Sequence, residues 1–184
     1  MSGDLYQNKY RIPSVRAEWH SYNVGYYFIT ICTHRREHFF GEIYNQQMNF
    51  SILGRRAESL IEEINIFYPD ANVLSHVVMP NHIHLIISVD KGWKRNSTNQ
   101  EADREVNEIM QDNSNQCGRL SIIISRFKSM LTRFARDNDI YFAWQSRFYD
   151  RIIRDHHELE RECCYVENNV YNWEDDELYP TEIP

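Results

Sequence analysis

The chain has 184 residues, of which 42% are hydrophobic and 26% charged, and its formal net charge is −7. Such a composition predicts one soluble globular domain over residues 1–184 and excludes a disordered chain. No apolar run approaches the roughly 18 residues of a membrane-spanning helix. The polar amino terminus carries no signal-peptide core and the four cysteines show no CxxC spacing, so we expect a reduced, cytoplasmic setting without membrane contact.

The charge is unevenly distributed along the chain. Residues 119–154 contain eight basic and three acidic side chains, whereas residues 155–184 contain ten acidic side chains and one basic. The overall acidity is therefore largely a property of the carboxyl-terminal part, and a basic surface ahead of it stays compatible with nucleic acid. The alternative is that these basic residues are ordinary solvated faces of helices and strands.

Apolar periodicity predicts the elements in chain order. Residues 24–33 are rich in β-branched and aromatic side chains and predict a strand. Apolar residues then recur at helical spacing up to Pro69, and Asp155 followed by Glu158 predicts the capped start of another helix. A short extended piece is expected at 47–51. The remaining predicted strands cover 72–78, 82–89 and 147–154, and the predicted helices cover 53–68, 119–136 and 156–170.

This order is βαββαβ followed by one more helix. It predicts an α+β, ferredoxin-like fold, in which helices cover one face of an antiparallel sheet and leave the other face free for a ligand. Residues 90–117 are polar and read as an insertion, with one exposed helix at 101–110. The acidic tail at 171–184 is expected to be loosely attached from Trp173 onward.

Two histidines stand one residue apart in the strand at 82–89. Side chains of a strand alternate between faces, so His82 and His84 project together while Ile83 and Leu85 face the opposite way. Neutral imidazole is the commonest metal ligand in proteins, and two on one strand can share a divalent ion. For a bare His-x-His pair, however, two polar side chains on a wet strand face are the more frequent case.

The last predicted helix adds Tyr165 and Asn169, which lie four residues apart and so on one helix face. An amide oxygen beside two imidazoles suits Mg²⁺ or Mn²⁺ better than a thiolate zinc site. Tyrosine is among the residues that form covalent intermediates, and a nearby divalent cation favours its phenolate. The alternative is that Tyr165 is an ordinary amphipathic side chain on the helix surface.

Together these segments resemble the single-tyrosine HUH transposases, and within them the REP-associated tyrosine transposases. The resemblance runs from GYYFITICT through VVMPNHIHLII, FKSMLTRFAR and WQSRFYDRIIRD to CYVENNV. It implies that His82 and His84 bind a metal, that Asn169 is the third ligand, and that Tyr165 on a carboxyl-terminal helix is the nucleophile.

The resemblance also implies a reaction and a partner. Tyr165 would attack a phosphodiester of single-stranded or hairpin DNA, leaving a 5′-phosphotyrosine link and a free 3′-OH that permits strand transfer. Candidate DNA contacts share a basic side chain in the positively charged segment: Arg119, Arg126, Lys128, Arg133, Arg147, Arg151 and Arg154. The alternatives are a hairpin-DNA-binding protein that has lost the chemistry, and a metal site of purely structural use. A homodimer is also left open.

Overall fold

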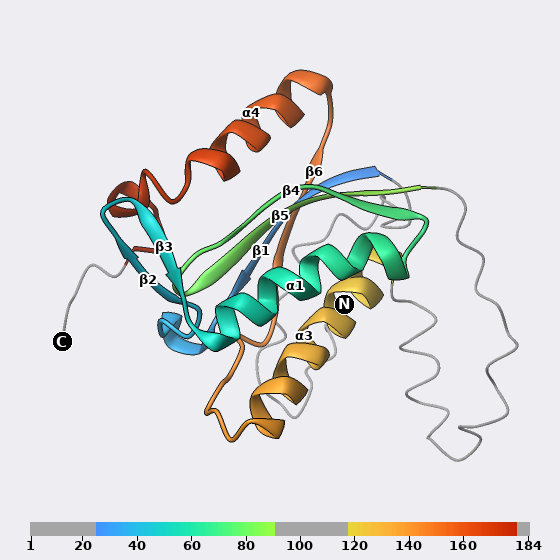
Figure 1. Ribbon diagram of the computed structural model, residues 1–184. Coiled ribbons are helices and arrows are strands. Elements are labelled where there is room, and N and C mark those ends of the chain that lie inside the picture. The colour runs from blue at the N-terminus through green and yellow to red at the C-terminus, as the bar shows by residue number, and fades with distance from the viewer. Residues whose placement is uncertain (1–24, 91–117, 180–184) are drawn as a thin grey trace, which may run out of the picture.

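A computed structural model describes residues 25–90 and 118–179. Its centre is a four-stranded antiparallel sheet in the order β4-β5-β1-β6, which is the ferredoxin-like arrangement predicted from the sequence (Figure 1). The strands are β1 (Gly25–Cys32), β4 (Ala71–Val78), β5 (His82–Val89) and β6 (Tyr149–Ile153). The helices are α1 (Ile52–Phe67), α3 (Arg119–Asp137) and α4 (His156–Asn168). The helix expected at 101–110 lies outside the described residues.

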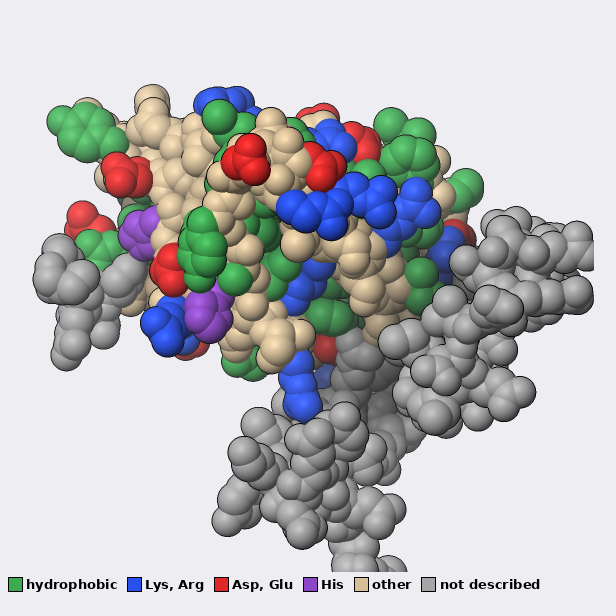
Figure 2. All heavy atoms as spheres, turned by 90° about the horizontal axis from the view of Figure 1, so that it is seen from below, with side chains coloured by type: hydrophobic (Ala, Val, Ile, Leu, Met, Phe, Trp, Pro, Cys, Tyr) green, Lys and Arg blue, Asp and Glu red, His purple; other side chains and the backbone are tan. Residues whose placement is uncertain are grey.

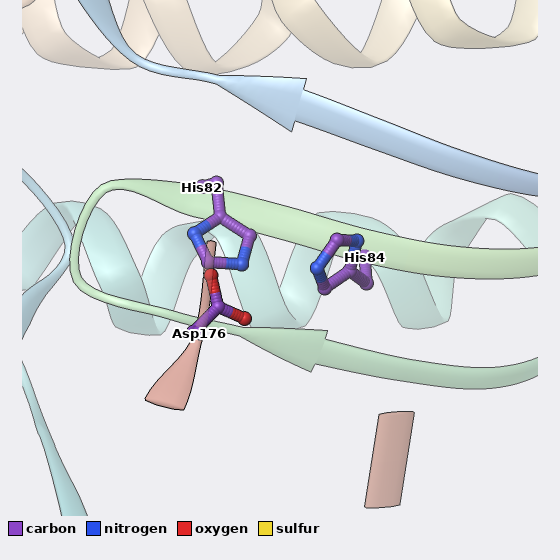
Figure 3. Close-up of side chains that lie close together, drawn as sticks. All are labelled: His82, His84 and Asp176. Carbon is purple, nitrogen blue, oxygen red and sulfur yellow. The ribbon is translucent and has the colours of Figure 1, made fainter. Parts of the chain in front are cut away.

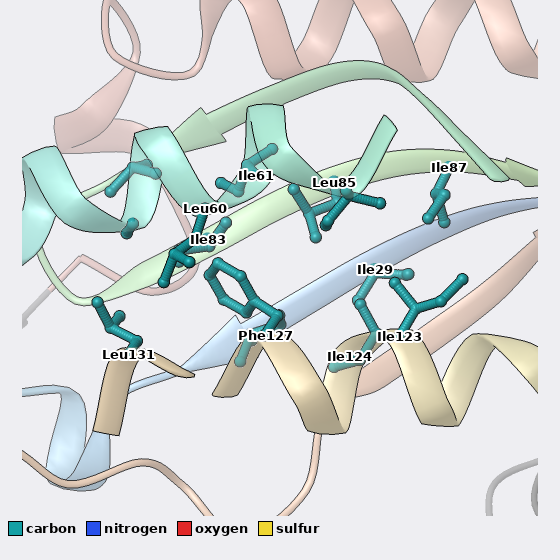
Figure 4. Packing of buried hydrophobic residues seen from close by; sticks show 14 of the residues in the cluster. Ile29, Leu60, Ile61, Ile83, Leu85, Ile87, Ile123, Ile124, Phe127 and Leu131 are labelled. Carbon is teal, nitrogen blue, oxygen red and sulfur yellow. The ribbon is translucent and has the colours of Figure 1, made fainter. Parts of the chain in front are cut away.

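The main core lies between the sheet and the layer of α1 and α3. Ile29 on β1 and Ile83, Leu85 and Ile87 on β5 are fully buried and point into this layer (Figure 4). They meet apolar stripes that repeat at helical spacing on α1 and α3, among them Leu60, Ile61, Ile123, Ile124, Phe127 and Leu131. Because strand side chains alternate, the intervening residues of β5, including both histidines, must face the opposite layer.

Helix boundaries follow local capping chemistry. Ser51 caps α1 by accepting a hydrogen bond from the Gly54 amide at 3.0 Å. Asp155 caps α4 as predicted, since its Oδ1 accepts from the Glu158 amide at 2.8 Å. In a capping box the Glu158 side chain would accept from the amide of the N-cap residue Asp155. Here Glu158 Oε2 accepts instead from the amide one residue earlier, that of Arg154, at 2.9 Å.

Sequence reasoning missed half of a small hairpin. Strands β2 (Gly41–Tyr44) and β3 (Gln47–Phe50) form a separate two-stranded sheet, of which only the second strand was expected. Asn45 and Gln46 join them with φ values of +50° and +59°. Two successive positive φ angles make a type I′ turn, whose twist suits a two-residue hairpin.

The second face of the sheet is not free, in contrast to the expectation. Helix α4 lies across it, on the side opposite α1 and α3 (Figure 1). Val166 of α4 is fully buried against Ile86 of β5 and Ile153 of β6. The tail is also attached more firmly than its composition suggested: Trp173, in the 3₁₀-helix η4 (Trp173–Asp175), is only 7% exposed. This second, smaller layer holds the candidate site.

Arg119 is buried at the start of α3, where it forms an ion pair with Asp70. Its Nε donates to Asp70 Oδ2 at 2.7 Å, and the two side chains are only 10% and 12% exposed.

Arg119→Ala should therefore lower the free energy of unfolding by about 3–5 kcal/mol, because it leaves a buried carboxylate without its partner. Exposed Arg126→Ala on the same helix is the control and should change stability by less than about 0.5 kcal/mol. Urea unfolding measures both, and equal effects would contradict a structural role for Arg119.

Candidate metal centre and nucleophile

His82 and His84 lie side by side on the face of β5 that α4 covers. They are 0% and 4% exposed, and their ring centroids are 4.5 Å apart (Figure 3). Their burial is not explained by apolar packing alone, because an imidazole carries two polar nitrogens that need partners. The structure therefore disfavours the alternative of two histidines on a wet strand face.

Each imidazole has one nitrogen engaged and one without a partner. His82 Nδ1 lies 2.7 Å from Asn81 Oδ1, and His84 Nδ1 lies 2.9 Å from Thr30 Oγ1. Since an amide oxygen only accepts, His82 must carry its proton on Nδ1 and present a lone pair on Nε2. The Nε2 atoms of both histidines are buried and, among the described residues, have no hydrogen-bond partner. This is the arrangement of a metal ligand held by its other ring nitrogen.

Asn169 and Tyr165 reach the same place from α4. Asn169 closes the helix, is 2% exposed, and keeps its Oδ1 buried without a partner among the described residues. The Tyr165 ring packs edge-on against His84 at 5.5 Å between centroids, while 43% of Tyr165 remains exposed. The structure thus brings together all four residues predicted from the sequence, although their chemical roles stay predictions.

Asp176, which sequence reasoning missed, completes the cluster. Ligand atoms of His82, His84 and Asp176 all lie within 4.8 Å of one another, so these three residues could hold a metal ion (Figure 3). Asp176 Oδ2 also accepts hydrogen bonds from the Tyr165 hydroxyl at 3.1 Å and from Asn169 Nδ2 at 2.9 Å. Asp176 therefore contacts the candidate nucleophile Tyr165 and the candidate ligand Asn169, and it lies beside both candidate histidine ligands. The available signal was Trp173, an apolar anchor inside an otherwise acidic tail.

The cluster borders a cavity of about 780 Å³. Its walls come from the sheet, from α4 and from the tail segment after it, and they include His84, Tyr165, Asn169 and Asp176. Two cations, Arg36 and Arg151, line the same cavity. The carboxylates of Glu162, Asp175, Asp176 and Glu177 line it as well, so an anionic, nucleotide-sized group would need the two arginines together with a bound cation to offset their charge.

Burial sets the protonation of the site. Desolvation lowers the pKa of His82 well below its ordinary value, with smaller contributions from His84 and Arg36. Desolvation likewise lowers the pKa of His84 to about 4, against an opposing effect of Asp176. Both imidazoles are therefore neutral near pH 7, the form that binds metals. Desolvation, followed by the negative charge of Asp176, raises the pKa of Tyr165 to about 12, so the hydroxyl holds its proton in the metal-free protein.

The low pKa of His84 predicts an acid-sensitive fold. Between pH 6.5 and about 4 the unfolded chain takes up a proton at His84 that the folded chain refuses, so the free energy of unfolding falls as the pH falls. This group alone should account for a loss of about 3 kcal/mol, fully expressed near pH 4. Urea unfolding in EDTA should show a smaller acid-induced loss for His84→Gln, which cannot titrate. The same loss in both proteins would contradict a buried neutral imidazole.

Comparison with known proteins shows a relative that aligns over most of both chains. No family model matches the chain. A protein of Haemophilus influenzae (strain ATCC 51907 / DSM 11121 / KW20 / Rd), described only as uncharacterized, is 36% identical over 168 residues, covering 90% of this chain and 92% of the relative. The chain belongs to the same family as this protein. Its relative's description carries no activity, so function must be argued from the site.

Among solved structures, a REP-associated tyrosine transposase bound to a REP hairpin has a similar fold. The TM-score is 0.54 at 15% identity, over 86% of this chain and 73% of the transposase. This similarity confirms the predicted α+β architecture. At 15% sequence identity it shows a shared fold and nothing further about the chain. Within the described residues, no helix has the length and apolar character needed to cross a membrane.

The four predicted DNA contacts on α3 lie across the sheet from this site. Arg119 is buried against Asp70, and Lys128 donates to the Gln145 carbonyl at 2.8 Å while packing 5.4 Å above the Trp144 ring. Burial lowers the pKa of Lys128, which agrees with a role in packing. Arg126 and Arg133 are exposed instead. Because they lie on α3, across the sheet from the candidate site, they could meet only DNA that extends beyond it. Figure 2 shows basic side chains in a row on one face of the molecule.

The predicted contacts around β6 lie nearer the site. Arg151 lines the cavity, but it is paired with Glu162 at 2.6 Å and with Glu158 at 3.6 Å. Arg147 and Arg154 are exposed at the two ends of the strand. Of the seven predicted contacts, Arg151 is thus the one that lines the cavity.

Proposed function

We propose that this protein is a metal-dependent DNA strand transferase of the tyrosine HUH class, acting on single-stranded DNA at a hairpin. The observation that carries the proposal is a set of three buried acceptor atoms without hydrogen-bond partners among the described residues: His82 Nε2, His84 Nε2 and Asn169 Oδ1. His84 and Asn169 line one cavity together with Tyr165, and the Tyr165 hydroxyl donates to Asp176, whose carboxylate lies within 4.8 Å of ligand atoms of both histidines. The fold shared with a transposase bound to a REP hairpin supports the same class.

The donor set fits a divalent cation. An unpaired buried acceptor costs about 1–3 kcal/mol, and three of them in one place are accounted for if an ion binds there. Two imidazoles with an amide or carboxylate oxygen suit Mn²⁺ or Mg²⁺, and Asp176 adds the negative charge that such a site needs. When bound, the ion would polarise the scissile phosphate and stabilise the charge that develops on it.

The side chains supply the nucleophile and its orientation. Tyr165 Oη attacks the phosphorus, forming the O–P bond of a 5′-phosphotyrosine while the bond to the 3′ oxygen breaks. The phenolic proton leaves toward Asp176 Oδ2, already its hydrogen-bond acceptor at 3.1 Å, and one proton passes from there to the 3′ oxygen, which is released as 3′-OH. Asp176 holds Tyr165 and Asn169 together, so nucleophile and ligand are oriented by one group.

The covalent step favours strand transfer over hydrolysis. A phosphotyrosine keeps the energy of the broken phosphodiester, so a 3′-OH that enters the cavity can attack it and restore both the DNA and Tyr165. Re-joining of a second strand is therefore part of the expected activity.

The test uses a DNA hairpin with single-stranded flanks, labelled on the 3′ side of the expected break, together with Mn²⁺ or Mg²⁺. The expected result is a labelled covalent complex that resists denaturation, an unlabelled fragment ending in 3′-OH, and no complex in EDTA. Tight hairpin binding without a complex in either metal would contradict the proposal. That outcome would instead support a binding protein that has lost the chemistry.

A further inference from the structure

Two successive arginines adopt an unfavourable backbone conformation beside the site. Arg35 and Arg36, in the short 3₁₀ segment η2 (His34–Arg36), have φ values of +51° and +57°. Non-glycine residues rarely enter this left-handed region, and two in a row persist only where the surroundings fix them. Such strain is often found where a side chain must be held in a particular place.

The surroundings of η2 do fix it. Thr33, which precedes the segment and is fully buried, donates from its backbone amide to the Asn81 carbonyl at 2.9 Å, and its Oγ1 lies within hydrogen-bond distance of the Glu37 and Asn81 carbonyls at 2.8 and 2.9 Å, between which its one proton is shared. The amide of His34 donates to the Ala143 carbonyl at 2.9 Å. The turn is thereby tied to Asn81, the residue that orients His82. Its position relative to the candidate metal ligands is therefore set by the fold.

This geometry brings the guanidinium of Arg36 to the cavity. The turn follows Cys32 at the end of β1, and Cys32 pairs directly with His82 across the sheet. Arg36 lines the cavity together with His84, Tyr165 and Asp176, whereas its neighbour Arg35 does not. The positive charge of Arg36 also contributes to the lowered pKa of His82, in agreement with its proximity.

Arg36 differs from Arg151, the other cation of the cavity, in how much of its charge is already compensated. Arg151 meets the carboxylates of Glu158 and Glu162. Arg36 donates to the carbonyl of Glu177 at 3.3 Å, and within the described part of the chain no salt bridge engages it. A guanidinium has five N–H donors in a planar fork that matches a phosphate, and most of this capacity remains available here.

We propose that Arg36 binds a phosphodiester of the DNA strand inside the cavity and positions it for Tyr165. The inference rests on the proposed function and adds a substrate-binding residue from the turn that follows β1. This turn places Arg36 in the lining of the cavity that His84 and Asp176 also line, so metal and guanidinium would hold the same strand. Arg119, buried against Asp70, and Lys128, packed over Trp144, are engaged within the fold, so Arg36 is the cation expected to meet substrate at the site.

The experiment compares Arg36→Ala, Arg36→Lys and Arg36→Gly with Arg35→Ala, a matched control that removes an exposed arginine from the same turn. Binding of a fluorescent hairpin with single-stranded flanks is followed by anisotropy in EDTA, between 50 and 200 mM salt. Arg36→Ala should weaken binding about tenfold and reduce the salt slope by about one, whereas Arg35→Ala should leave both near the wild-type values. Arg36→Lys should restore the slope with only part of the affinity.

Arg36→Gly distinguishes a loss of DNA binding from a loss of folding. Glycine tolerates positive φ, so this variant should melt at or above the wild-type temperature while binding DNA as weakly as Arg36→Ala. Equal effects of the Arg36 and Arg35 variants would overturn the inference while leaving the proposed function intact. If the wild-type protein itself binds no hairpin, the proposed function fails and the inference fails with it.

Discussion

Tyr165→Phe is expected to abolish the covalent protein–DNA complex and to reduce strand cleavage by at least about 10³-fold. The substitution removes only the phenolic oxygen, which is the atom that would form the bond to phosphorus. The ring contacts with His84 and Phe28 stay, and what is lost is the hydrogen bonding of the phenolic oxygen with Asp176 and Asn169. Because Tyr165 is 43% exposed, the variant should fold and still bind hairpin DNA and Mn²⁺.

The matched control is Tyr171→Phe, since Tyr171 is 64% exposed a few residues further along the chain. This variant should retain the complex at the wild-type level. A complex that survives in Tyr165→Phe would assign the nucleophile to another residue. A complex lost in both variants would point to a general disturbance of the carboxyl-terminal segment.

The second large effect is expected at the two histidines. His84→Ala or His82→Ala should weaken Mn²⁺ binding by more than about 100-fold in calorimetric titration, because each removes one imidazole from the shell. His76→Ala is the control: His76 also lies in the sheet, but it faces Glu58 of α1 at 3.2 Å and lies outside the cluster. It should bind Mn²⁺ as the wild type does.

The same titration distinguishes the oxygen ligands. Asn169 Oδ1 has no partner, so Asn169→Ala should weaken Mn²⁺ binding as well. Asp176→Ala should do so only if its carboxylate enters the shell, and otherwise it should leave metal affinity unchanged while slowing formation of the complex. Unaltered Mn²⁺ binding in both histidine variants would contradict a metal site at this place, whichever oxygen ligand completes it.

The central layout could be predicted from the sequence because it depends on short periods. The alternation of β5 places His82 and His84 on one face, and the helical period stacks Tyr165 below Asn169. The order of strands and helices indicated the ferredoxin-like sheet, in which the face carrying both histidines is the one that α4 covers. Sequence spacing alone could not predict how α4 crosses the sheet. This crossing brings Tyr165 and Asn169 to the pair of histidines.

Asp176 and Arg36 were missed for a different reason. Their positions depend on contacts between segments far apart in the chain: Trp173 buries the tail near His82, and Thr33 ties the strained turn to Asn81. A run of acidic residues resembles a solvated tail in composition, and a left-handed arginine has no sequence signature. Only tertiary packing shows that these side chains reach the site.

The basic segment could not be assigned to one surface from the sequence, because a count of charges ignores faces and partners. Arg119 belongs to a buried ion pair with Asp70, and Lys128 packs over Trp144. Both lie on the layer of the sheet opposite to the histidines. The count of eight basic residues did not locate a surface, whereas Arg36, which lines the cavity and is proposed to bind phosphate, comes from a turn outside that segment.

The most direct test of the account is to digest the protein after reaction with hairpin DNA and Mn²⁺ and to locate the nucleotide-bearing peptide by mass spectrometry. The account predicts one modified residue, Tyr165, joined through its phenolic oxygen to a 5′-phosphate, with a 3′-OH on the released strand. Attachment to another residue, or cleaved DNA whose 5′-phosphate is free and never protein-bound at any time in the reaction, would contradict it.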